Sequence, residues 1–112
     1  MSATLTYLTF DCADALGQAA FWAAVLDQPV AADGTTECAV VGAAPRWMFL
    51  QVPEGKTVKN RLHPDLATTD LPAEVERLVA LGATRLAEHT EDGATWVTLR
   101  DPEGNEFDLV EG

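Results

Sequence analysis

The order of predicted elements repeats once along this chain. A strand-like run over residues 4–12 leads to a helix cap at Asp14, and a second run over 61–69 leads to a helix cap at Asp70. The caps are 56 residues apart, which is half of the 112-residue chain, and Tyr7 and His63 show the same spacing. Such a repeat predicts two copies of one supersecondary unit, in which the runs over 4–12 and 61–69 are equivalent strands.

The first copy contains a helix and several strands. Small and apolar residues recur at helical spacing over 15–26, and Pro29 follows the end of this helix. Residues 53–60 are polar and carry Pro and Gly, which indicates a linker. Between helix and linker we expect a short strand over 30–32 and longer strands over 37–42 and 46–52.

The second copy follows the same order. Pro72 in the first turn and Gly82 just past the end delimit a helix over 71–81. Strands are expected over 84–88, 95–100 and 106–110. The chain therefore reads β-α-β-β-β twice, as one α+β domain over 1–112 with modules over 1–55 and 59–112.

A tight polar loop joins the last two strands. Pro102 presets φ for a turn, and Gly104 and Asn105 tolerate positive φ, so D-P-E-G-N at 101–105 predicts a β-hairpin.

A five-residue loop places Thr98 opposite Asp108, while Phe107 and Leu109 share the other face. A carboxylate between two large apolar residues then has two interpretations. Asp108 lies either on a solvated sheet face or in a pocket that needs a polar group.

The hairpin resembles a known superfamily. D-P-E-G-N-E-F-D-L at 101–109 is similar to the closing hairpin of the vicinal-oxygen-chelate superfamily, which includes glyoxalase I, extradiol dioxygenases, fosfomycin-resistance transferases and bleomycin-binding proteins. K-N-R-L-H-P-D-L at 59–66 and L-x-x-L-G-A at 78–83 resemble its short glyoxalase-like domain proteins. The resemblance implies two tandem β-α-β-β-β modules that form a curved mixed sheet, with a central cleft and helices on the outer faces.

The resemblance also implies where a metal would bind. The metal enzymes of the superfamily carry ligands at four equivalent positions, which in this chain are Tyr7, Leu50, His63 and Asp108. His63 and Asp108 suit a divalent transition metal, whereas Leu50 cannot ligate and the phenol of Tyr7 must first lose a proton. Two ligands are fewer than the three that catalytic metals usually need. We therefore expect no complete metal site; if a metal binds, His63 and Asp108 hold it.

Without a metal, His63 and Asp108 form a candidate catalytic pair. A carboxylate beside an imidazole fixes its tautomer, so the pair can act as a general base or as a polar anchor for a ligand. The structural alternative is that His63 only bonds to a neighbour at the start of a strand. Trp22 and Trp47 are expected in the core. The predicted ligand-binding residues on the same face are Tyr7, Thr9, Met48, Leu50, Trp96, Thr98 and Arg100.

Composition restricts the partners. The chain is 47% hydrophobic with a net charge of −11 and a pI near 4.3, and the negative charge argues against nucleic acid and an anionic membrane surface as partners. The acidity either suits a cationic ligand or serves solubility. Apolar runs stay well below the roughly 18 residues of a membrane span, and no signal peptide is recognised. Cys12 and Cys38 lack metal-type spacing and are expected as reduced, buried residues in the cytoplasm.

Three classes of function fit these features. The first, which we favour, is a module that binds a small organic molecule without a catalytic metal. The second is a metal-dependent lyase, isomerase or dioxygenase that uses His63 and Asp108. The third is a relative in fold alone that serves as a subunit or interaction domain, since a fold does not determine a function.

We predict a homodimer, because short two-module chains of the superfamily usually pair. Light scattering should give twice the mass of the 12.0 kDa chain over a wide concentration range. A monomer throughout that range would reject the prediction.

Overall fold

The computed structural model describes residues 2–42 and 44–112. The chain forms two compact units, one ending at Gly55 and the other running from Lys56 to Gly112. Within the described residues, no helix has the length and apolar character to cross a membrane.

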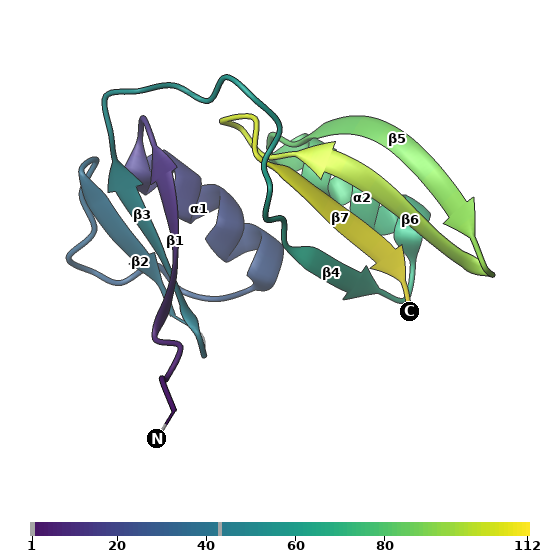
Figure 1. Ribbon diagram of the computed structural model, residues 1–112, viewed down its shortest axis with the longest axis horizontal. Coiled ribbons are helices and arrows are strands. Elements are labelled where there is room, and N and C mark those ends of the chain that lie inside the picture. Colours follow the sequence, from purple (N-terminus) through teal and green to yellow (C-terminus); the bar gives the residue numbers. More distant parts are fainter. Residues whose placement is uncertain (1, 43) are drawn as a thin grey trace. The chain divides into compact units, whose positions relative to one another are not determined.

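The first unit is a three-stranded sheet with one helix. Its elements are β1 (Tyr7–Cys12), α1 (Ala15–Leu26), β2 (Cys38–Val41) and β3 (Arg46–Gln51). The sheet order is β1-β3-β2, and β3 runs parallel to β1 and antiparallel to β2. Figure 1 shows α1 lying across one face of this sheet.

The second unit is a four-stranded sheet with one helix (Figure 1). Its elements are β4 (Asp65–Thr68), α2 (Leu71–Leu81), β5 (Thr84–Glu91), β6 (Ala94–Arg100) and β7 (Glu106–Glu111). The sheet order is β4-β7-β6-β5, with β4 parallel and β6 antiparallel to β7.

The two units share one topology, which confirms the predicted α+β class and modular order. In each unit, the last strand pairs in parallel with the strand that precedes the helix. On its other side, the last strand pairs antiparallel with the strand directly before it in the chain. The prediction of a strand over 30–32 is wrong. Val30 forms only an isolated β-bridge to Val41. That bridge occupies the place that β5 fills in the second unit.

Both helices have the predicted bounds because their caps are local. The side chain of Asp14 accepts a hydrogen bond from Gly17 N, and that of Asp70 accepts one from Ala73 N, each at 3.2 Å. Gly82 ends α2 with a φ of 124°, a conformation that favours glycine.

Several predicted strands have different ends. The strand expected over 61–69 is limited to Asp65–Thr68, so His63 lies in the segment before it rather than on the strand. Pro64 directly precedes β4, and a proline has no N–H to donate to a ladder. The strand expected over 84–88 continues to Glu91, because Asp92 and Gly93 take positive φ and form a tight hairpin turn.

Each core lies between a sheet and its helix. In the first unit, the ring centroid of Trp22 on α1 lies 5.8 Å from that of Phe10 and 5.0 Å from that of Trp47. Trp22 and Trp47 are both buried, as the sequence predicts. In the second unit the fully buried side chains of β6, β7 and α2 are Leu99, Phe107, Leu109 and Leu78.

Phe107→Ala should lower the free energy of unfolding by about 3–5 kcal/mol, because it removes a fully buried ring and leaves a cavity. Chemical denaturation measures the change. Leu62→Ala is the control, because Leu62 is 89% exposed and should change stability by only about 0.5 kcal/mol or less. A small loss for Phe107→Ala would contradict the assigned core.

Candidate functional site

The candidate site lies on the face of the β4-β7-β6-β5 sheet that points away from α2, here called the open face. Side chains alternate along a strand, so burial of Phe107 and Leu109 against α2 turns Asp108 to the open face. The predicted register is confirmed, since Thr98 pairs with Asp108. Thr98 Oγ1 donates a hydrogen bond of 2.6 Å to Asp108 Oδ1. Asp108 is therefore held in one orientation with its side chain 20% exposed.

The structure brings His63 to this carboxylate. His63 Nδ1 lies 3.8 Å from Asp108 Oδ2 and 2.8 Å from Asp65 Oδ1. The backbone contributes as well, because Asp108 N donates to Pro64 O at 3.0 Å and so ties the residue after His63 to β7.

Asp65 is a site residue that the sequence reasoning missed. It pairs with Asp108 across the parallel strands, and its side chain is 61% exposed beside His63. The signal was present in the H-P-D sequence, because residues two apart on an extended segment point to the same side.

These residues also offer donors for a metal. Ligand atoms of His63, Asp65 and Asp108 all lie within 4.8 Å of one another. An imidazole nitrogen with two carboxylates is a donor set that divalent transition metals accept, and three protein ligands are the usual number in catalytic sites. The donor set therefore fits, with Asp65 in addition to the two residues predicted.

The other predicted residues of the second unit flank Asp108. Trp96, Thr98 and Arg100 alternate along β6 and share the open face. The ring of Trp96 stacks on His89, with centroids 5.3 Å apart and an interplanar angle of 27°. One end of the open face is thus aromatic.

The predicted residues of the first unit share a face of their own sheet. Tyr7, Thr9, Met48 and Leu50 lie on the face opposite α1, because Phe10, Trp47 and Phe49 face the helix. Tyr7 accepts a 3.3 Å hydrogen bond from Arg46 Nη1 and borders an open hollow of about 590 Å³. That these residues join the second set around one cleft stays a prediction.

The register corrects one equivalence between the units. The cap spacing aligns Thr9 with Asp65; β3 pairs Thr9 with Met48, and β7 pairs Asp65 with Asp108. Met48, rather than Leu50, is therefore the counterpart of Asp108. The sequence analysis placed this counterpart two residues too late, at Leu50, because the number of residues between the two paired strands differs between the units. Neither Met48 nor Leu50 has a side chain with an oxygen or nitrogen atom that could bind a hard metal ion.

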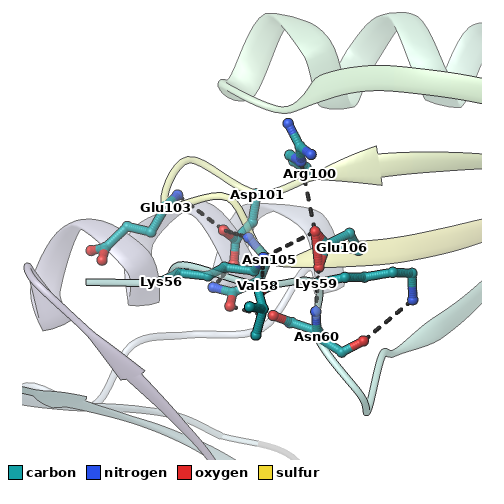
Figure 2. A network of polar contacts seen from close by, with 9 residues as sticks. All are labelled: Lys56, Val58, Lys59, Asn60, Arg100, Asp101, Glu103, Asn105 and Glu106. Atoms are coloured by element: carbon teal, nitrogen blue, oxygen red, sulfur yellow. Dashed lines mark hydrogen bonds and ion pairs between the residues drawn. The ribbon is translucent and has the colours of Figure 1, made fainter. Parts of the chain in front are cut away.

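A second carboxylate on the open face, Glu106, is almost fully buried. Its Oε1 accepts a 2.7 Å hydrogen bond from Asn60 N, and its Oε2 accepts one of 3.1 Å from Lys56 Nζ (Figure 2). Arg100 Nε lies 3.7 Å from Oε2. Burial opposes ionisation of Glu106, but the donors of Asn60 and Lys56 outweigh it and hold the pKa below its usual value.

The adjoining turn is bonded into the same network. Asp101 Oδ1 accepts from Glu103 N and Asn105 N at 2.9 and 3.0 Å, and Oδ2 accepts from Asn105 Nδ2 at 2.9 Å. Asn60 Nδ2 then donates to Asn105 Oδ1 at 3.2 Å. The hairpin loop and the segment around Asn60 are therefore linked through side chains (Figure 2).

Comparison with known proteins gives one family match. A family model described as a glyoxalase-like domain matches residues 7–110. No curated protein matches the sequence.

Solved structures share the fold at low identity. A glyoxalase/bleomycin resistance protein/dioxygenase family enzyme from Burkholderia phytofirmans PsJN is 18% identical, with 96% of this chain and 98% of that chain covered and a TM-score of 0.80. Lactoylglutathione lyase from Agrobacterium tumefaciens is 15% identical, with 100% of this chain and 96% of that chain covered and a TM-score of 0.69. A mutant of the fosfomycin resistance protein FosX from Listeria monocytogenes, complexed with Mn(II) and 1S,2S-dihydroxypropylphosphonic acid, is 14% identical, with 100% of this chain and 91% of that chain covered and a TM-score of 0.80. At these low identities it is the TM-scores that show a common fold.

Glu106→Gln should lower the free energy of unfolding at pH 7 by about 2–4 kcal/mol, because the neutral amide cannot form the ion pairs that the buried carboxylate makes with Lys56 and Arg100. Since folding depresses the pKa of Glu106, its stabilisation is complete above the usual value near 4.5 and is lost as the pH falls through the folded-state value. The gap between parent and variant should therefore narrow in acid. Denaturation at several pH values measures it, and a gap independent of pH would contradict the assignment.

Proposed function

The chain belongs to the glyoxalase-like domain family, and from this premise we propose that it binds a small organic ligand on the open face of its second sheet. Asp108 is the central polar anchor. The observation that carries the proposal is the convergence of Thr98 and His63 on this partly exposed carboxylate, in the middle of a strand whose neighbouring residues are buried.

The chemistry of the face favours a ligand with hydrogen-bond donors. Asp65 and Asp108 present carboxylate oxygens, which accept from hydroxyl or amino groups. The stacked rings of Trp96 and His89 supply a flat surface beside them. The net charge of −11 disfavours an anionic ligand. A small, neutral or cationic molecule with a flat part fits these features best.

His63 has a distinct role in this proposal. An imidazole that donates from Nδ1 to Asp65 presents Nε2 as an acceptor, so the contact of 2.8 Å favours a single tautomer. His63 then orients the ligand or accepts a proton from it. Thr98, Trp96 and Arg100 line the site, and Tyr7, Thr9, Met48 and Leu50 remain proposed lining residues from the first unit.

A second candidate is a metal-dependent lyase, isomerase or dioxygenase. The specific observation in its favour is Asp65, which raises the number of nearby donors to three. His63, Asp65 and Asp108 would hold the ion. A bound divalent metal supplies Lewis-acid polarisation of a ligand oxygen. The extensive exposure of Asp65 and His63 keeps this candidate second.

The ligand proposal predicts the effect of Asp108→Asn. A screen of small aromatic amines and hydroxy compounds against ¹⁵N-labelled protein should give hits that shift the amide signals of Trp96, Thr98 and Asp108. Asp108→Asn should weaken those hits about 10- to 100-fold, because the charge-assisted hydrogen bond is lost. Asp92→Asn, in an exposed turn, should leave affinity unchanged. Hits whose affinity is insensitive to Asp108→Asn would contradict the proposal.

Calorimetric titration with Ni(II) or Co(II) separates the two candidates. We expect weak binding by the parent protein. Tight one-to-one binding that both Asp65→Asn and His63→Ala abolish would put the metal-dependent candidate first.

A further inference from the structure

The segment that carries His63 has no regular secondary structure. Residues 52–64 lie between β3 and β4 without helix or strand. Two apolar side chains near His63 do not hold the segment, because Val58 is 74% exposed and Leu62 is 89% exposed. What fixes His63 beside Asp108 therefore has to be polar.

Two attachments to β7 enclose His63. On one side Asn60 N donates to Glu106 Oε1, and on the other side Asp108 N donates to Pro64 O. His63 lies between Asn60 and Pro64, so both ends of its short stretch are tied to a single strand. Lys56 adds a third contact further back, where Nζ bridges Glu106 Oε2 and Val58 O at 3.1 and 2.6 Å.

Glu106 is the centre of these contacts. It lies two residues before Asp108 and so shares the open face with it. Its side chain is only 6% exposed, and a carboxylate in such a place needs charged or donor groups around it. Asn60, Lys56 and Arg100 supply them from the segment and from β6 (Figure 2).

We propose that Glu106 is a positioning residue for the site: it pins the segment over 56–60 and thereby sets His63 beside Asp108. Glu106 does not touch the ligand in this scheme. The purpose assigned to His63 rests on the proposed function, whereas the pinning itself does not.

The test compares Glu106→Gln and Lys56→Met with Lys59→Met. Lys59 belongs to the same segment and contacts only Asn60 O in the described hydrogen bonds, so its replacement is a matched control. The readouts are nuclear Overhauser contacts between the His63 ring and the Asp108 β-protons, and the amide hydrogen exchange of residues 58–63. Neither readout needs a ligand, so the result is independent of the ligand screen.

We expect Glu106→Gln and Lys56→Met to weaken the contacts of His63 and to speed exchange over 58–63 about tenfold, while β6 and β7 stay protected. Lys59→Met should change neither readout. If Glu106→Gln does not fold, the pair of lysine variants decides, because both lysines lie outside the sheet. His63 contacts that persist in a folded Glu106→Gln, or in Lys56→Met where that variant decides, would overturn the proposal.

Discussion

The side-chain alternation of β7 is the constraint on which the second unit depends. This strand is paired on both sides, with β4 and with β6, and its buried residues Phe107 and Leu109 pack toward α2. Because successive side chains point to opposite faces, Glu106 and Asp108 must then face away from the helix. A slip of one residue would bury both carboxylates in an apolar core and expose both apolar side chains. The place of the two acidic groups thus follows from core packing, and the site inherits the rigidity of the sheet.

The first unit uses the same alternation with different chemistry. Trp47 and Phe49 are buried against α1, and Met48 and Leu50 take the opposite face. Topology and helix caps repeat between the units because both are set by local rules of pairing and capping. The polar groups do not repeat, since the register puts Met48 where the second unit has Asp108. The repeat therefore specifies the fold twice, while the acidic and imidazole groups of the candidate site belong to the second unit.

The sequence predicts the features that depend on near neighbours. Asp14 and Asp70 give both helix starts, and the five-residue loop gives the pairing of Thr98 with Asp108. Prediction from the sequence fails for contacts between segments that are far apart along the chain. Periodicity identifies Glu106 as the start of a strand, yet its partners Asn60 and Lys56 are 46 and 50 residues away, and one of them donates through its backbone. No local pattern distinguishes that backbone N–H from any other. Asp65 is a different case, because the H-P-D spacing is local and already places its carboxylate on the same side as His63. No local pattern, however, distinguishes an acidic residue of a site from a solvated one at the start of a strand.

The polar attachment of the His63 segment has a physical consequence that apolar packing would not give. Burial of apolar surface is non-directional, so a loop held by Val58 or Leu62 could shift along the sheet at little cost. Hydrogen bonds weaken steeply with distance and angle, so contacts at Glu106 and at the amide of Asp108 fix one register of the segment on β7. His63 lies between these contacts, and its ring nitrogen has to lie within a few tenths of an ångström of its place to keep the 2.8 Å contact with Asp65. A buried carboxylate costs stability unless its partners are in place. That same cost disfavours every arrangement in which the segment leaves Glu106, and so it favours the arrangement that brings His63 to Asp108.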